Sequence, residues 1–261
     1  MKLKLYQVDA FADKLFTGNP AAVCPLGSEW LDSAVMQRIA MENNLAETAF
    51  YILRDGKHHI RWFTPEIEVD LCGHATLAAS HVLFNHEGFT GDKLVFASRS
   101  GDLTVTREGD LIALDFPTDT IKKAKLSKQL LACFKQKPLE AYKGRHDYML
   151  VFKNEAQIRD IKPDFAAINK VPARGVIVTA VGDKAHFVSR FFAPQSGIFE
   201  DPVTGSAHTT LAPYWRDALG TRDMTALQLS PRTGKLLVRV RGNRTIILGK
   251  AVTYLRGEIE I

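Results

Sequence analysis

The chain has 261 residues, 46% of them hydrophobic, which is enough to build one large packed domain or two modest ones. Its 34 basic and 29 acidic residues give a net charge of +5, but they are spread along the chain, and only residues 122–128 form a basic cluster. Nucleic-acid binding typically shows a basic patch with interleaved aromatic residues. We therefore expect no nucleic-acid partner.

The sequence shows neither a targeting signal nor a pair of closely spaced cysteines. The first residues mix charged and apolar side chains, unlike a signal peptide, and no window approaches the roughly 18 apolar residues of a membrane span. Cys24, Cys72 and Cys133 are widely spaced and form no C-x-x-C pair, which argues against a disulfide framework and structural zinc. We expect a cytoplasmic protein with no membrane partner.

The first half of the chain predicts short strands and two helices. Strands are expected at 3–9, 20–24, 47–53, 58–63, 93–98, 102–107 and 111–116. A helix over 30–43 places Leu31, Val35 and Ile39 at helical spacing. A second helix over 75–84 is hydrophobic on most faces, which places it in a core.

The polar and basic segment 117–125 is the expected boundary between an N-terminal domain, 1–117, and a C-terminal domain, 118–261, with a C-terminal tail that can cross back. Beyond this boundary we expect a helix over 126–134, strands near 146–152, 174–180 and 186–192, a helix from Gly205, and strands at 226–229, 235–241, 244–249 and 252–258.

Three signatures recur in the same order in the two halves. Arg61-Trp-Phe-Thr-Pro65 matches Arg190-Phe-Phe-Ala-Pro194, Gly73-His-Ala75 matches Gly205-Ser-Ala207, and Gly101-x-Leu-x-Val105 matches Gly234-x-Leu-x-Val238. Ordered repetition of this kind predicts a duplicated domain. The chain has too few helices for a doubly wound α/β fold, so we expect an α+β fold in which each half curls a mostly antiparallel sheet around one apolar helix.

Residues that could take part in binding or catalysis lie where the two apolar helices begin. Gly73 and Gly205 can each be explained as a tight turn. As a pair in a duplicated fold, however, they would bring free helix N–H groups to a cleft between the domains, where these groups could hold a carboxylate or a developing enolate. Asp201, just before the second helix, either stabilises the helix dipole or serves the same site.

Glu47 and His74 are the candidate proton-transfer groups. Glu47 lies between apolar neighbours where a helix gives way to a strand, and is either an exposed strand residue or a general base. His74 is either a packing residue or, beside a helix N-terminus, a neutral imidazole available for proton transfer. No two histidines show metal-binding spacing, so we expect no metal.

Cys72 and Asn19 complete the set of candidates. Cys72 could be a racemase thiol whose pKa the helix start lowers, but the matching position is Thr204, so a two-thiol mechanism lacks one arm and we favour a pocket-lining role. Asn19 either reaches a ligand or braces its own turn. No nucleotide-binding or pyridoxal-phosphate motif is present, so no cofactor is expected.

Four segments resemble the signatures of the PhzF family, the phenazine-biosynthesis isomerase and its relatives. They are Gly18-Asn-Pro-Ala-Ala-Val23, Asn44-Leu-Ala-Glu-Thr-Ala-Phe50, Phe63-Thr-Pro-x-x-Glu-Val-x-Leu-Cys-Gly-His-Ala-Thr76 and Glu200-Asp-Pro-Val-Thr-Gly-Ser-Ala-His208. The resemblance implies a diaminopimelate-epimerase-like fold of two pseudo-symmetric domains with the active site between them. It also implies a cytoplasmic homodimer that works without metal or cofactor.

By the same resemblance, Glu47 falls on the family's proton-shuttling glutamate, His74 and Asp201 on supporting groups, and Gly73 and Ser206 on substrate contacts. Asn19, Thr204 and Gly205 are further expected substrate-binding residues. We therefore expect a cofactor-independent isomerase that moves a proton on a small carboxylated metabolite with Glu47 as the base. The alternatives are a one-thiol racemase or epimerase using Cys72 and a non-catalytic metabolite-binding protein.

Overall fold

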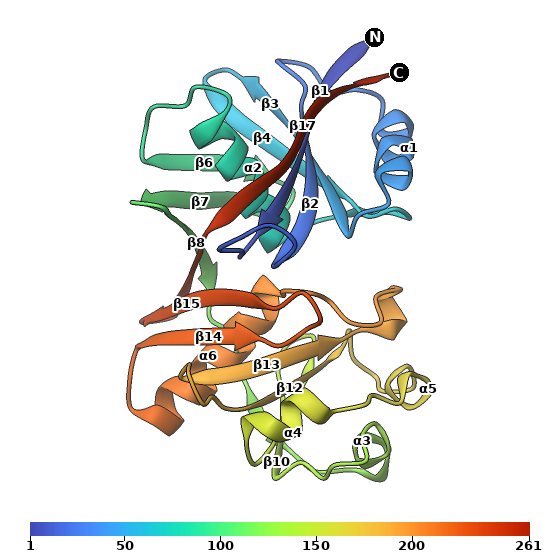
Figure 1. The fold of residues 1–261 in the computed structure, drawn as a ribbon, viewed down its shortest axis with the longest axis vertical. Coiled ribbons are helices and arrows are strands. Elements are labelled where there is room, and N and C mark those ends of the chain that lie inside the picture. The colour runs from blue at the N-terminus through green and yellow to red at the C-terminus, as the bar shows by residue number, and fades with distance from the viewer. The chain divides into compact units, whose positions relative to one another are not determined.

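A computed structural model describes residues 1–261. The chain divides into two compact units, one made of residues 1–115 and 248–261 and the other of residues 116–247. Each unit is a curled sheet of parallel and antiparallel strands with one long apolar helix against it (Figure 1). No helix has both the length and the apolar character needed to cross a membrane.

The first unit contains most strands of the N-terminal half together with the last strand of the chain. Its strands are β1 (Lys2–Ala10), β2 (Asn19–Pro25), β3 (Glu47–Arg54), β4 (Lys57–Phe63), β5 (Glu68–Val69), β6 (Lys93–Ser98), β7 (Gly101–Glu108), β8 (Leu111–Pro117), which leads into the second unit, and β17 (Ala251–Glu260). Its helices are α1 (Ser33–Asn43) and α2 (Gly73–Asn85). Nearly every side chain of α2 is buried, as its apolar sequence predicts.

The second unit has shorter helices around the same kind of sheet. Its strands are β9 (Lys122–Ala124), β10 (Glu140–Lys143), β11 (Tyr148–Val151), β12 (Val176–Val181), β13 (Phe187–Phe192), β14 (Asp223–Gln228), β15 (Gly234–Arg241) and β16 (Arg244–Gly249), which leads back to the first unit. Its helices are α3 (Lys128–Ala132), α4 (Glu155–Asp160), α5 (Phe165–Ile168), the 3₁₀ turn η1 (Pro194–Ser196) and α6 (Gly205–Leu219).

Strand pairing follows one pattern in both units. In the first unit β17 pairs with β1 and β1 with β2 in antiparallel fashion, β2 pairs with β3 in parallel, β3 with β4 antiparallel, β4 with β6 parallel and β6 with β7 antiparallel. The second unit repeats these directions along β9, β10, β11, β12, β13, β14 and β15. The topology is therefore duplicated, as the sequence signatures predict.

A pair of arginine bridges shows the duplication at the level of side chains. In β4 the Arg61 guanidinium donates two hydrogen bonds of 2.7 Å to the Glu68 carboxylate. In β13 Arg190 makes the same bidentate bridge to Glu200, at 2.7 and 2.9 Å. Each guanidinium also lies about 5 Å from the ring of the phenylalanine two residues later, at 5.1 Å in the first unit and 5.0 Å in the second. The matched Arg-x-Phe signatures thus encode the same local structure.

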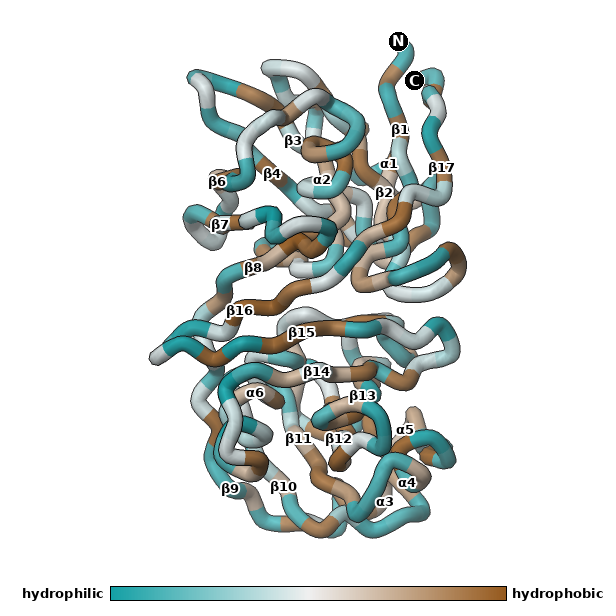
Figure 2. The backbone as a smooth tube through the Cα atoms, turned by 60° about the vertical axis from the view of Figure 1, so that its left-hand side comes forward, coloured by the Kyte–Doolittle hydropathy of each residue, from teal (hydrophilic) through white to brown (hydrophobic).

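Local sequence accounts for the limits of the helices. The Asp32 carboxylate accepts a hydrogen bond from the Ala34 N–H, so α1 begins at Ser33, three residues later than expected. Asn44, with a φ of 49°, ends the helix in the left-handed conformation that asparagine tolerates. In β17, hydrophobic residues are interspersed with hydrophilic ones (Figure 2), and most positions of the strand are exposed.

Candidate active site

The first cluster of candidate residues lies in the first unit, where two parallel strands and a helix begin. Ala21 of β2 is in register with Glu47 of β3, so the starts of these strands are neighbours. Asn19 is the first residue of β2, Glu47 the first of β3 and His74 the second of α2. Parallel pairing thus brings together side chains that are far apart in the sequence.

Gly18 is required for the approach of the chain to β2. Its φ is +69°, and a Cβ atom placed there would lie 2.2 Å from the carbonyl oxygen of Ala10. Any side chain would therefore force the backbone away from this path. The Gly-Asn-Pro turn fixes Asn19, whose side chain is fully buried beside His74.

His74 lies at the centre of the cluster. Its Nε2 atom is 3.1 Å from Oε2 of Glu47, while the side-chain amide of Asn19 lies 3.3 Å from its Nδ1 atom and the Cys72 sulfur 3.5 Å from it. The side chains of His74 and Glu47 are only 6% and 13% exposed. An acid, an imidazole and a thiol are therefore held together out of bulk water.

The contact between Glu47 and His74 is close but not aligned. Although Oε2 and Nε2 are within ion-pair distance, neither of these buried atoms has the geometry of a hydrogen bond to any protein group. Buried polar atoms are nearly always hydrogen-bonded in folded proteins, and an exception calls for a functional explanation. Both atoms retain the capacity to bind a further polar group.

Electrostatics favours the protonated form of His74. Burial alone disfavours the imidazolium, but the Cys72 sulfur and the Glu47 carboxylate outweigh it and raise the pKa of His74 well above its ordinary value. The direction of this shift is opposite to the sequence expectation of a neutral imidazole, which was based on the helix N-terminus. A carboxylate 3.1 Å away has a larger effect than the helix dipole.

The pKa of the Cys72 thiol is raised as well. Burial, followed by repulsion from the Glu47 carboxylate, raises the pKa of Cys72, so the lowering expected from the helix start does not dominate. One ligand atom from each of Glu47, Cys72 and His74 lies within 4.8 Å of the others, a grouping that could hold a metal ion. Sequence spacing missed this grouping because its members come from two separate elements.

The start of α2 places backbone N–H donors beside the same cluster of side chains. Cys72 is the N-cap residue, yet its side chain makes no capping hydrogen bond. The first hydrogen bond of the helix runs from the Thr76 N–H to the Cys72 carbonyl, so the N–H groups of Gly73 and His74 have no partner within the helix. Such donors stabilise negative charge.

The second cluster lies at the start of α6 in the second unit. Thr204 is the N-cap residue of α6 and, like Cys72, makes no capping hydrogen bond. Its hydroxyl instead donates to Oδ2 of Asp201 at 2.5 Å. The N–H groups of Gly205 and Ser206 in the first turn are thus not capped by Thr204.

Gln228, a residue that sequence reasoning missed, fixes this turn. It is fully buried in β14 and donates to the Asp201 carbonyl at 2.8 Å, while its Oε1 accepts from the Thr204 N–H at 2.9 Å. Close packing adds to this, because a Cβ at Gly234 would lie 2.1 Å from a methyl group of Val203. No motif marks Gln228, since its role depends on strand pairing.

The predicted residues therefore form two sets. Asn19, Glu47, Cys72, Gly73 and His74 lie together in the first unit, and Asp201, Thr204, Gly205 and Ser206 in the second. A hollow of about 580 Å³ in the second unit is lined by other residues, among them Arg159 and Arg190. Both arginines are already paired with carboxylates, so we assign no chemistry to this hollow.

The comparisons with known proteins agree with the fold and assign the chain to a family. The family model described as "Phenazine biosynthesis-like protein" matches residues 8–257. The chain belongs to this family, PhzC-PhzF. An uncharacterized isomerase of Pseudomonas aeruginosa is 49% identical over 261 residues, covering 100% of both chains.

Solved structures support the same assignment. The PhzF-family protein of Enterococcus faecalis has a TM-score of 0.97 and 47% identity, with 100% of each chain covered. A probable proline racemase from Agrobacterium radiobacter shares the fold with a TM-score of 0.65 at 10% identity, covering 99% of this chain and 92% of the racemase. The expected epimerase-like α+β fold is confirmed, and this PhzF-family member is an isomerase.

Proposed function

We propose that this PhzF-family isomerase moves a proton on a small carboxylated metabolite by general acid–base catalysis with Glu47. The observation that supports the proposal is the unaligned contact between Glu47 Oε2 and His74 Nε2, two buried atoms 3.1 Å apart without a hydrogen bond. A purely structural pair would satisfy its hydrogen bonds. A pair that receives and returns a proton keeps this capacity for the substrate.

In this proposal Glu47 removes a proton from the carbon next to a carboxylate and returns it elsewhere. Negative charge then develops on the carboxylate oxygens, where the N–H groups of Gly73 and His74 stabilise it. His74, whose pKa is raised by the Cys72 sulfur and the Glu47 carboxylate, supplies an acidic proton. Asn19 holds the ring of His74 in place.

The second set of residues is proposed to contact the substrate as well. Asp201 supports proton transfer, while Thr204, Gly205 and Ser206 provide a hydroxyl, backbone donors and a second hydroxyl. This rests on the uncapped start of α6, which has the same N-cap irregularity as α2. Helix starts of this type bind carboxylate and phosphate groups.

Solvent deuterium exchange tests the role of Glu47. A set of amino and hydroxy acids is incubated with the protein in D₂O, and loss of the α-proton signal is followed by NMR. We expect Glu47→Gln to slow exchange by about 10²–10⁴-fold, the usual contribution of a general base. Glu66→Gln, which removes the same charge from an exposed loop residue, should exchange as the wild type does.

Equal exchange by wild type and Glu47→Gln on a compound that is turned over would reject the assignment of Glu47. Unfolding midpoints of both variants should be measured alongside, so that a loss of folded protein is not mistaken for a loss of chemistry.

A one-thiol mechanism is the second candidate, because the Cys72 sulfur lies 3.5 Å from His74 Nδ1. In that mechanism a neutral His74 takes the thiol proton, and the resulting thiolate removes the α-proton of the substrate. Loss of exchange in Cys72→Ser with Glu47→Gln tolerated would favour it. The raised pKa of Cys72 opposes the thiolate, so we place Glu47 first.

A homodimer in the cytoplasm that needs no cofactor is also proposed, on the family resemblance alone. Light scattering coupled to size-exclusion chromatography measures the oligomeric state. Activity after dialysis against a chelator tests the metal requirement. A chelator-sensitive exchange rate would turn attention to the Glu47, Cys72 and His74 grouping.

A further inference from the structure

We propose that Arg145, His146 and Arg174 of the second unit bind a small anion through its carboxylate or phosphate group. The anion site rests on the geometry of the second unit alone and is independent of the proposed function.

The turn that holds Arg145 and His146 is fixed to α6. The Asp119 carboxylate accepts from the Arg145 N–H at 3.2 and 3.1 Å and from the Thr210 hydroxyl of α6 at 2.8 Å. Gly144 makes room for this arrangement, because a Cβ there would lie 2.3 Å from Oδ2 of Asp119. The backbone of the turn therefore has one position relative to the start of α6.

Arg174 joins the same turn from the β12 side. Its N–H donates to the His146 carbonyl at 2.9 Å, and its guanidinium makes a bidentate bridge to Asp147, whose side chain is only 2% exposed. The guanidinium also lies 5.3 Å from the ring of Phe191. These contacts use the Nε and Nη2 donors and leave Nη1 without a protein partner, on a side chain that is 37% exposed.

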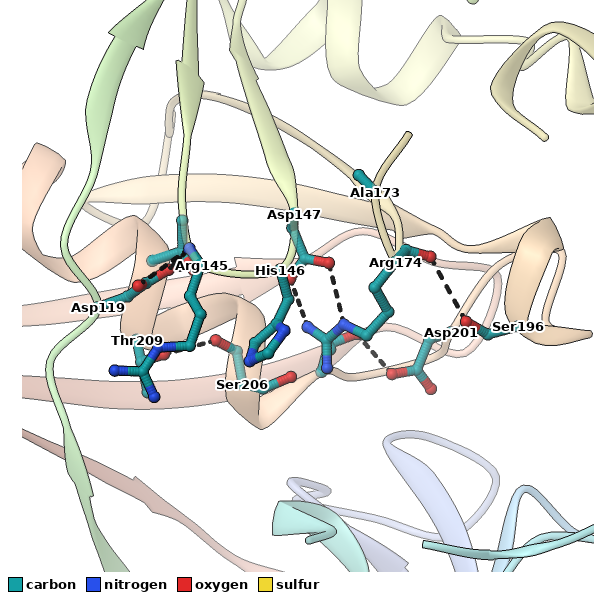
Figure 3. Close-up of polar contacts among 12 residues, drawn as sticks. Asp119, Arg145, His146, Asp147, Ala173, Arg174, Ser196, Asp201, Ser206 and Thr209 are labelled. Atoms are coloured by element: carbon teal, nitrogen blue, oxygen red, sulfur yellow. Dashed lines mark hydrogen bonds and ion pairs between the residues drawn. The ribbon is translucent and has the colours of Figure 1, made fainter. Parts of the chain in front are cut away.

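The three basic side chains extend to one side of this framework. Figure 3 shows Arg145, His146 and Arg174 pointing the same way, toward Ser206 in the first turn of α6. The Arg145 guanidinium and the His146 ring make no hydrogen bond or ion pair with the protein. Asp201 lies past Arg174, at the end of the row away from Arg145 (Figure 3).

The Arg145 guanidinium has no carboxylate partner within the protein. Asp147 pairs with Arg174, and the oxygens of Asp119 accept from backbone and hydroxyl donors. Arg159 and Arg190 of the same unit, by contrast, each have a carboxylate partner. A guanidinium on an anchored turn, next to a second guanidinium with a vacant N–H edge, suits a carboxylate or phosphate.

Binding of simple anions to the whole protein tests the site without knowledge of the substrate. Inorganic phosphate, malate and lactate are titrated calorimetrically at one fixed ionic strength, since exposed charges are screened by salt. We expect Arg145→Ala to weaken binding of phosphate or malate by about tenfold, the loss of one charge-assisted contact. If the site accepts carboxylates, Arg145→Ala should weaken lactate binding as well, because the single carboxylate of lactate meets the same guanidinium.

The matched control is Lys135→Ala, which removes the same charge from an exposed residue of the second unit. It should bind all three anions as the wild type does. Arg174→Lys keeps a charge opposite Asp147 but loses the planar donor edge, and should also weaken binding of the anion that Arg145 recognises. Whichever of phosphate and malate responds to both variants identifies the anionic group that the site prefers.

Wild-type affinity for malate and phosphate in both arginine variants overturns the proposal, as does an equal loss in Lys135→Ala. Glu47→Gln separates this result from the proposed function, because it should abolish proton exchange and leave anion binding intact. If Glu47→Gln still exchanges protons while Arg145→Ala loses the anion, the catalytic proposal fails and the anion site stands.

Discussion

At the scale of single residues, two buried histidines near the starts of equivalent helices behave in opposite ways. His74 in α2 faces the Glu47 carboxylate and the Cys72 sulfur, which raise its pKa. No carboxylate raises the pKa of His208 in α6, and burial lowers this pKa to about 4. Its Nδ1 donates to the Thr204 carbonyl at 2.8 Å, while its Nε2 is buried without a partner. The two helix starts therefore shift the pKa of their histidines in opposite directions.

His208 predicts a loss of stability in acid. Its pKa in the folded state, about 4, lies below the ordinary value of 6.5, so below pH 6.5 the unfolded chain binds a proton that the folded chain does not. The free energy of unfolding should fall as the pH drops from 6.5 toward 4, by about 3 kcal/mol from this residue. Urea unfolding at pH 7.5, 5.5 and 4.5 measures it.

The variant His208→Asn isolates this contribution, since an amide can still donate to the Thr204 carbonyl but does not titrate. Its stability should change less with pH than that of the wild type over the same window. Parallel pH curves for the two proteins would show that His208 is not the cause. His81, with a pKa also lowered to about 4, remains in both proteins and cancels from the comparison.

At the scale of elements, the duplicated Arg-x-Phe signature fixes one corner of each sheet. Arg190 bridges Glu200 and also donates to the carbonyls of Ile158 and Ile161, at 3.2 and 2.8 Å, where α4 ends. The side chains of Arg190 and Glu200 are 11% and 15% exposed. The bridge therefore ties β13, α4 and the segment before α6 together in a largely dry environment.

Removing the Arg190 guanidinium should lower the free energy of unfolding. Arg190→Met leaves a mostly buried Glu200 without a counter-ion, and we expect a loss of about 3–5 kcal/mol in unfolding free energy. Adding Glu200→Gln should restore part of the loss, because the uncompensated charge is gone. Chemical denaturation of the single and double variants measures both steps.

An exposed bridge provides the comparison for Arg190. Lys57 and Asp102 pair at 2.8 Å with side chains 42% and 58% exposed, so Lys57→Met should cost less than about 1 kcal/mol. If Arg190→Met were as mild as Lys57→Met, the bridge would not be holding the corner of the sheet.

Sequence pattern was sufficient for the long elements and insufficient for the short ones. Hydrophobic periodicity located α2 and α6 and the hairpin strands, because each buries one continuous face. It missed β9, β10, α4 and α5, which are three to six residues long and too short to show a period. Their positions are set by pairing and packing with distant segments.

The same limit applies to the site. Asn19, Glu47 and His74 could be named because each stands in a distinctive local motif, and the parallel pairing of β2 and β3 then brings them together. Gln228, Arg145 and Arg174 could not be named, since nothing beside them in the sequence marks their contacts. The sequence alone also could not predict the raised pKa of His74, because it depends on a 3.1 Å distance to Glu47. That the substrate lies between the two domains stays a prediction.

At the scale of the whole chain, the first unit completes its sheet with a strand from the far end of the sequence. The first unit uses β17, which pairs with β1 from Lys2↔Glu260 to Ala10↔Ala251. The N-terminal amine of Met1 also donates to the carbonyl of Ile261, and the two ends of the chain lie side by side (Figure 1). The last strand of the chain is therefore as much part of the first unit as the first strand.

Adjacent termini predict that the chain tolerates circular permutation. A short Gly/Ser linker from Ile261 to Met1, with new ends between Asp55 and Gly56, should keep the fold, because both residues of this hairpin tip are exposed and β3 and β4 stay paired. Deleting residues 251–261 should instead leave β1 without one of its two antiparallel partners and expose a long strand edge, which promotes aggregation. Solubility, thermal unfolding and solvent proton exchange compare the two variants with the wild type. A permutant as unstable as the deletion would mean that the order of strands along the chain, and not only their pairing, is needed to form the first unit.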